Sequence, residues 1–127
     1  MAGEQVLVVE DNEKNMKLFR DVLGASGYRT LEATTGRRAV ELAIEHRPAL
    51  VLMDMRLPDV DGHEALRRLR ADVRTASMPV LAVTAQAMQG DRERLLAEGF
   101  DGYLSKPVDI VELVATVRRH CGGHAPP

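Results

Sequence analysis

The chain has 127 residues, of which 45% are apolar and 28% charged, and its formal net charge is −2. This length fits one domain around a single core. The charge balance argues against a nucleic-acid-binding surface, and no apolar stretch is long enough to cross a membrane. Residues 1–4 have no signal-peptide character, and Cys121, the single cysteine, cannot form an internal disulfide. We therefore expect a cytoplasmic protein that binds neither nucleic acid nor membrane.

Apolar runs and amphipathic segments alternate along the chain. The expected strands cover 6–9, 29–33, 50–53, 80–83 and a stretch after Phe100 that reaches 103–105. The expected helices cover about 12–25, 36–46, a segment with Ala65, Leu66 and Leu69, about 88–98, and 108–120. This alternation indicates an α/β fold with a parallel sheet and helices on both faces. We predict a five-stranded, doubly wound sheet within a domain over 4–120, followed by a flexible tail at 121–127.

Polar side chains follow four of the expected strands. Glu10 and Asp11 come directly after the first strand, Asp54 after the third, Thr84 after the fourth and Lys106 after the fifth. In open α/β sheets, ligands bind outside the carboxyl ends of the strands. If these strands are neighbours, the sheet brings three carboxylates, a hydroxyl and an ammonium group into one crevice.

The three acids favour a divalent cation. Crowded carboxylates repel one another, and some would take up protons unless a cation neutralised them. Oxygen ligands suit Mg²⁺, with Mn²⁺ as the alternative ion. Taken alone, Asp11 could equally cap the helix that follows it. Asp54 ends the most apolar run, and a carboxylate there can attack a phosphoryl group and carry it as an aspartyl phosphate.

Lys106 and Thr84 suit a bound phosphoryl group. Lys106 would place a positive charge beside the phosphoryl oxygens, and Thr84 would offer one of them a hydroxyl. Taken singly, a lysine is usually a solvated surface residue and a strand-end threonine usually bonds its local backbone. The bond between Lys106 and Pro107 is a candidate for the cis isomer, which would fix where the lysine points.

These residues lie in four motifs that together resemble the receiver domain of two-component response regulators. The resemblance covers about 4–119, and its motifs are VLVVEDN (6–12), LVLMDMRLPDVDG (50–62), VLAVTA (80–85) and GYLSKP (102–107). It implies the strand order 2-1-3-4-5. The segments 9–19 and 84–107 are similar both to single-domain receivers of the DivK type and to receivers attached to hybrid histidine kinases.

The resemblance also implies a role for each matching residue. Asp54 is the expected phosphoacceptor, and the expected ligands of Mg²⁺ are Asp54, Asp11, Glu10 through water and the backbone carbonyl of Arg56. The expected switch and phosphate-binding residues are the hydroxyl of Thr84, the aromatic ring of Tyr103 and the ammonium of Lys106. The first helix would help to dock the phosphate donor through Asn15, Met16 and Phe19.

The function implied is a phosphorylation switch in a phosphorelay. A sensor histidine kinase or a histidine phosphotransfer protein would supply the phosphate, and the modified chain would bind a downstream protein target. The chain would catalyse only its own phosphorylation and dephosphorylation. It stops one helix after Lys106, so we expect no output domain, and a receiver excised from a hybrid histidine kinase is the alternative. We expect a monomer, or a weak dimer through the face of the last helix.

Three other interpretations fit the sequence less well. An aspartate-nucleophile phosphatase of the haloacid dehalogenase class needs a second acid two residues after the nucleophile, and Arg56 stands there. A flavodoxin-like cofactor binder needs a phosphate-cradling loop after the first strand, and the acidic segment 11–13 would repel a phosphate. A soft-metal site at His120, Cys121 and His124 has no recognisable ligand spacing.

Overall fold

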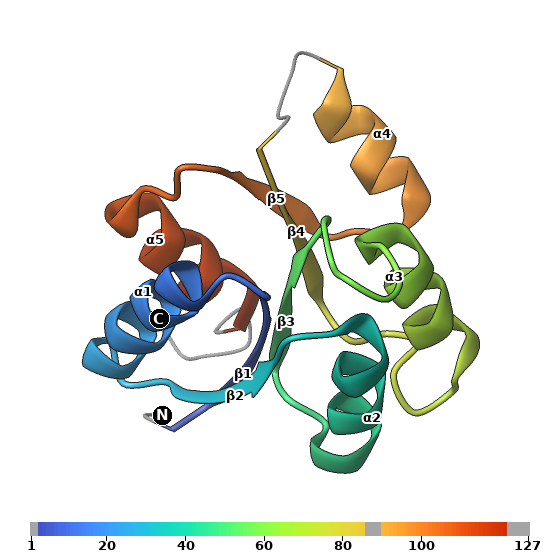
Figure 1. Ribbon diagram of the computed structural model, residues 1–127, viewed down its shortest axis with the longest axis horizontal. Helices are drawn as coiled ribbons and strands as arrows, with labels where there is room; N and C mark the ends of the chain where they lie inside the picture. Colours follow the sequence, from blue (N-terminus) through green and yellow to red (C-terminus); the bar gives the residue numbers. More distant parts are fainter. Residues whose placement is uncertain (1–2, 86–89, 122–127) are drawn as a thin grey trace.

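The computed structural model describes residues 3–85 and 90–121. Its strands are β1 (Gln5–Val9), β2 (Arg29–Ala33), β3 (Leu50–Asp54), β4 (Val80–Thr84) and β5 (Gly102–Ser105). Its helices are α1 (Glu13–Ala25), α2 (Gly36–His46), α3 (Gly62–Ala71), α4 (Asp91–Glu98) and α5 (Ile110–Cys121). The strands form one parallel sheet in the order β2-β1-β3-β4-β5 (Figure 1), which confirms the predicted fold.

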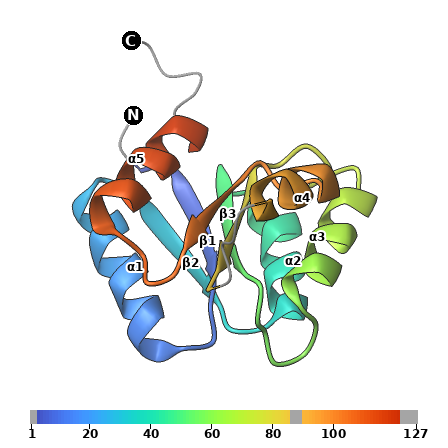
Figure 2. The same ribbon diagram turned by 90° about the horizontal axis from the view of Figure 1, so that it is seen from above.

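The helices cover both faces of the sheet. Helices α1 and α5 lie on one face, and α2, α3 and α4 lie on the other (Figure 2). Two apolar clusters fill the space between these layers, one for each face. The residues of β3 are all buried, because this strand lies in the middle of the sheet and is covered from both sides. Its last residue, Asp54, therefore has a rigid backbone beneath it.

Helix α3 packs closely against the end of β3 because Gly62, its first residue, has no side chain. A Cβ at Gly62 would lie 2.7 Å from Sδ of Met55 and 3.0 Å from the carbonyl oxygen of Asp54, so a larger residue would push the helix away. Asp61 caps this helix by accepting a hydrogen bond from the backbone N–H of Glu64 at 2.9 Å. The first turn of α3 thus begins directly beside the end of the central strand.

Several helix ends differ from the sequence prediction. Asn12 caps α1 and accepts the backbone N–H of Asn15 at 3.0 Å, so Asp11 is not the cap. Helix α4 begins at Asp91 after Gly90, whose φ of +94° is left-handed, and 88–89 of its predicted span lie outside the described residues. Cys121 is the buried last residue of α5, which corrects its assignment to a flexible tail. The rest of that tail, 122–127, lies outside the described residues.

None of the described helices has both the length and the continuous apolar character that a membrane span requires. This agrees with the short apolar runs in the sequence, each of which forms a strand of the sheet.

Candidate functional site

Three carboxylates meet at the carboxyl ends of β1 and β3. Val9 of β1 pairs with Met53 of β3, so Glu10, which follows β1, lies beside Asp54, the last residue of β3. Glu10, Asp11 and Asp54 each offer one oxygen atom, and these three atoms lie within 4.8 Å of one another. Glu10 and Asp54 are buried and Asp11 is exposed. The structure therefore brings together the three acids that the sequence singles out.

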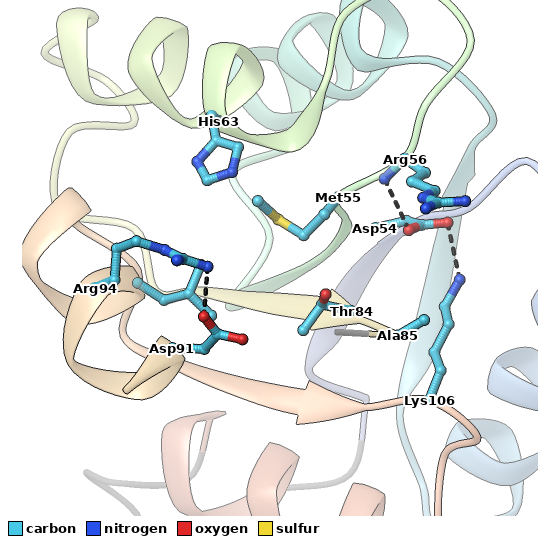
Figure 3. Close-up of a pocket in the computed structure, with 10 residues that line it drawn as sticks. Asp54, Met55, Arg56, His63, Thr84, Ala85, Asp91, Arg94 and Lys106 are labelled. Carbon is cyan, nitrogen blue, oxygen red and sulfur yellow. Dashed lines mark hydrogen bonds and ion pairs between the residues drawn. The ribbon is translucent and has the colours of Figure 1, made fainter. Parts of the chain in front are cut away.

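The carboxylate of Asp54 is held by two donors from different elements. Its Oδ1 accepts the backbone N–H of Arg56 at 3.0 Å, and its Oδ2 accepts the ammonium of Lys106 at 3.0 Å (Figure 3). The first donor is local, because the chain turns directly after β3. The second comes from the end of β5, although β4 separates β5 from β3 in the sheet. Asp54 is thus oriented from two sides at its strand end.

Lys106 bridges two of the acids. Besides its bond to Asp54, its Nζ lies 3.2 Å from Oε1 of Glu10. Burial alone would lower the pKa of Lys106, but the carboxylates of Asp54 and Glu10 outweigh it and raise the pKa above its ordinary value. The ammonium therefore stays charged near neutral pH. The peptide bond between Lys106 and Pro107 is cis, which is the isomer considered from the sequence.

Glu10 is the most buried acid of the site. Only 1% of its surface is exposed, and its Oε2 accepts the backbone N–H of Asn12 at 3.0 Å. Its Oε1 faces Lys106 as an ion pair but makes no hydrogen bond of acceptable geometry. Burial raises the pKa of Glu10, and the neighbouring Asp54 raises it further. This carboxylate lacks a full set of partners within the described chain.

The residues present fit a magnesium ion. A buried carboxylate oxygen without a hydrogen bond is costly unless a further ligand or cation approaches it. Glu10 supplies such an oxygen, and the exposed carboxylate of Asp11 lies beside it at the open side of the cluster. Hard oxygen donors of this kind are the ligands that Mg²⁺ takes in proteins, usually together with retained waters. The role of the Arg56 carbonyl remains a prediction.

A cleft of about 220 Å³ opens beside Asp54. Thr84, at the end of β4, Arg56 and Lys106 line it together with Asp54 (Figure 3), so four of the predicted site residues border one cleft. The far wall is built by α3 and α4, where His63 bonds Glu98 and Arg94 pairs with Asp91. Tyr103 is not among the residues that line this cleft. It packs half-buried against the α2–α3–α4 core and faces a separate groove beside β5.

The expected docking residues on α1 need a correction. Met16 and Phe19 are buried in the core between α1 and the sheet, with 4% and 1% of their surface exposed, so they cannot offer contact area to a partner. Asn15 is half-buried and remains available in part. Ile110 and Val111 at the start of α5 are 52% and 79% exposed, and neither was predicted from the sequence as a docking residue. The sequence does show two adjacent apolar residues at the start of the predicted last helix, and this pattern could have indicated an exposed apolar surface.

A family model and the sequences of related proteins both match this chain over most of its length. The family model described as the response regulator receiver domain matches residues 6–118. The polar-differentiation response regulator DivK of Brucella anthropi is 47% identical over 119 residues, which is 94% of this chain and 97% of the relative. DivK of Brucella ovis is 46% identical over the same shares of both chains.

Solved structures agree with these relatives. The receiver domain of the sensor histidine kinase PA1611 from Pseudomonas aeruginosa has a TM-score of 0.87 and 40% identity, covering 95% of this chain and 99% of that one. That structure has a magnesium ion coordinated in its active-site cleft. The chemotaxis protein CheY4 of Vibrio cholerae has a TM-score of 0.86 and 26% identity, covering 94% of this chain and 99% of the other.

Proposed function

This chain belongs to the response regulator receiver domain family, and on that basis we propose that it takes a phosphoryl group from a phosphohistidine onto Asp54. One observation supports this most directly: Lys106 pairs with Asp54 at 3.0 Å and with Glu10 at 3.2 Å, inside a cluster of three carboxylates. This arrangement places a cation and a metal-ligating set around one oriented carboxylate. It suits phosphoryl transfer, which depends mainly on positioning and on charge neutralisation.

In the proposed reaction, the N–P bond of the phosphohistidine breaks and an O–P bond to the carboxylate of Asp54 forms. The backbone N–H of Arg56 and the ammonium of Lys106 hold that carboxylate before the reaction. Glu10, Asp11, Asp54 and the carbonyl of Arg56 would hold Mg²⁺, which would neutralise the charge of the phosphoryl group. Lys106 then pairs with the phosphoryl oxygens. Attack of water on the acyl phosphate returns the carboxylate and releases inorganic phosphate.

Phosphorylation of Asp54 would act as a signal by changing the conformation of the chain. Thr84 lines the cleft beside Asp54, so its hydroxyl can donate to a phosphoryl oxygen once that group is present. Tyr103 lies on the next strand, where Ala82 is its register partner, and it borders the groove between α4, β5 and α5. Movement of Thr84 and Tyr103 would shift the population between two packings of this face and change which downstream protein binds it.

The phosphate donor would dock beside the cleft on the α1 and α5 side. Asn15 belongs to α1, and Ile110 and Val111 begin α5, which packs beside α1 (Figure 2). Ile110 and Val111 are exposed and apolar, and Asn15 is half-buried and polar, which is the mixed character common in transient interfaces. The donor is a sensor histidine kinase or a histidine phosphotransfer protein.

The test is phosphorylation of purified chain by a phosphohistidine-bearing kinase in the presence of Mg²⁺. Asp54→Asn keeps the shape of the side chain but removes the nucleophilic charge, so it should take up no acid-labile phosphate. Asp21→Asn, on the exposed side of α1 and paired with Lys17 at 2.5 Å, is the matched control and should behave as the unmodified chain. Uptake by Asp54→Asn at the unmodified rate would reject the assignment.

A further inference from the structure

Helix α4 is held to the rest of the molecule by little apolar surface. Among its eight residues, the only apolar side chain that is buried is that of Leu95, whereas the neighbouring α3 buries Ala65, Leu66 and Leu69. An element with few buried apolar contacts is one that most readily changes its packing. The position of α4 therefore depends strongly on its polar contacts.

His63, in the first turn of α3, makes one of these polar contacts. Its Nδ1 forms a hydrogen bond with the carboxylate of Glu98, the last residue of α4. The same ring meets the buried ring of Phe100 edge to face, with 6.2 Å between the ring centroids and 79° between the ring planes. Phe100 lies between α4 and β5. The imidazole therefore joins the start of α3 to the end of α4 and to the segment that leads into β5.

The start of α3 is itself fixed to the strand that ends in Asp54. The backbone N–H of Gly62, the residue before His63, donates to the carbonyl oxygen of Met55 at 3.2 Å. The carbonyl oxygen of Asp54 is so near that a Cβ at Gly62 would lie 3.0 Å from it. His63 thus stands on a firm support beside β3, and α4 is the partner that is free to move.

The contact joins the two walls of the cleft beside Asp54. His63 lines this cleft from α3, and its ring is directed from that helix into the cleft (Figure 3). Asp91, Arg94 and Leu95 line it from α4. Glu98 is not among the lining residues, so its carboxylate reaches the site only through its bond to His63. A change at Glu98 can therefore alter the hold on α4 while it leaves the cleft wall intact.

We propose that the contact between His63 and Glu98 is a latch, which holds α4 in the packing that the structure shows and opens when Asp54 is phosphorylated. In this packing Lys106 binds the carboxylate of Asp54 itself, at 3.0 Å. A phosphoryl group on Asp54 would draw Thr84 toward it, and α4 is the next helix along the chain after Thr84. The latch resists the movement of α4 that follows.

The latch would set part of the free-energy difference between the two packings. A contact that is present in only one of two conformations favours that conformation by the free energy of the contact. His63 and Glu98 are positioning residues in this scheme, because they act on phosphorylation through α4. The latch rests on the proposed function, since it concerns the response of α4 to a group on Asp54.

The test uses trifluoroberyllate, an analogue of the phosphoryl group that binds a carboxylate oxygen, in the presence of saturating Mg²⁺. Its affinity is measured by calorimetry for the unmodified chain and for Glu98→Ala. Loss of a partly exposed ion pair should raise the affinity by roughly two- to fivefold, because the packing that binds the analogue becomes more populated. An affinity that is unchanged or weaker would overturn the latch.

A double-mutant cycle separates the latch from a direct effect of charge. His63→Leu removes the same contact and keeps an apolar side chain against Phe100. Because the contact is then already absent, adding Glu98→Ala to His63→Leu should produce no further gain in affinity. A further gain equal to that in the unmodified chain would mean that the charge of Glu98 acts on the bound anion directly, and would overturn the latch. Glu45→Ala is the matched control: Glu45 lies in the last turn of α2, 3.8 Å from His46, and its loss should leave the affinity unchanged.

Amide spectra distinguish a released α4 from a damaged fold. Without the analogue, the ¹H–¹⁵N signals of residues 91–98 in Glu98→Ala should lie between those of the unmodified chain with and without the analogue, because the population has shifted toward the second packing. Signals that move away from that line would overturn the latch, because they indicate a local loss of structure.

The two proposals fail in different ways. If the unmodified chain does not bind the analogue, the assignment of Asp54 as the phosphoacceptor fails together with the latch. If the unmodified chain and Glu98→Ala bind the analogue equally well, the latch fails and the assignment of Asp54 stands.

Discussion

The charge balance of the site depends on Lys106. Its ammonium lies within 3.2 Å of Glu10 and within 3.0 Å of Asp54, so it compensates two buried carboxylates at once. The sequence placed Lys106 at the end of a strand, but not in contact with both acids. That contact depends on how far a flexible side chain reaches from β5 past β4, which no local pattern encodes.

Lys106→Met tests this balance in the absence of metal. Methionine keeps most of the apolar stem but removes the charge, which leaves Oε1 of Glu10 and Oδ2 of Asp54 without their cation. We expect a loss of about 1–3 kcal/mol in the free energy of unfolding, measured by urea denaturation with a chelator present. Lys17→Met, which removes an exposed ammonium from α1, should cost far less.

The same variant should bind Mg²⁺ at least as tightly as the unmodified chain. A positive charge beside the ligand carboxylates repels an incoming cation, so its removal should strengthen binding by a few fold. Titration of the two proteins with Mg²⁺ measures this difference. Markedly weaker binding by Lys106→Met would mean that Lys106 organises the metal ligands and does not merely compensate their charge.

At the scale of the elements, local patterns predicted the regular segments well, and the wrong docking role of two buried side chains did not come from these patterns. The predicted 36–46 helix agrees with α2, and the strands β3 and β4 extend their predicted runs by one polar residue. Met16 and Phe19 were assigned to partner docking, although their helical spacing is that of a buried stripe. Their burial could be predicted from α1 alone, whereas the docking role came from the resemblance.

The loop after β3 is tied to α2 by Asp59. Its carboxylate accepts the backbone N–H of Gly36 at 2.8 Å and of Arg37 at 2.9 Å, at the start of that helix. Asp59 is exposed, and the slight desolvation of its carboxylate would raise its pKa, but the backbone hydrogen bonds from Arg37, Gly36 and Val60 outweigh this and lower the pKa from 3.8 to about 2. Because Asp59 lies between Asp54 and α3, this contact holds the loop that borders the site.

Asp59→Asn should reveal this contact through its pH dependence. The folded-state pKa is below the ordinary value, so the carboxylate stabilises the fold above about pH 3.8 and loses that effect as the pH falls toward about 2. Near pH 6 we expect the variant to be less stable by about 0.3–1 kcal/mol, typical of a charge at a helix N-terminus. The difference should shrink in urea denaturations from pH 6 toward pH 3, and a constant difference would argue against the assignment.

At the scale of the whole molecule, the parallel sheet followed from the alternation of strands and helices, but its strand order did not. The order came from the resemblance to receiver domains, and the structure confirms it. The order matters chemically because it places β1 directly beside β3, which brings Glu10 and Asp11 to Asp54. Without this strand order, nothing would bring the acids at 10, 11 and 54 close to one another. The spacing of residues along the chain alone does not predict that β1 lies beside β3.

The adjacency predicts that Mg²⁺ stabilises the entire fold. The unfolded chain does not hold these acids together, so an ion that binds only the folded chain adds about 2.7 kcal/mol when its concentration is 100 times Kd. The melting temperature of the unmodified chain should therefore rise with the logarithm of Mg²⁺ concentration above Kd. NaCl at matched ionic strength controls for screening of exposed charges.

Asp11→Asn separates metal binding from the fold itself. Asp11 is exposed and does not cap α1, so its replacement should leave the metal-free chain at least as stable as before, because one of three crowded charges is removed. The same change should weaken the Mg²⁺-dependent rise in melting temperature, because the carboxylate proposed as a direct ligand becomes neutral. A rise equal to that of the unmodified chain would remove Asp11 from the ligand set. A metal-free variant that melts well below the unmodified chain would instead show that Asp11 supports the fold.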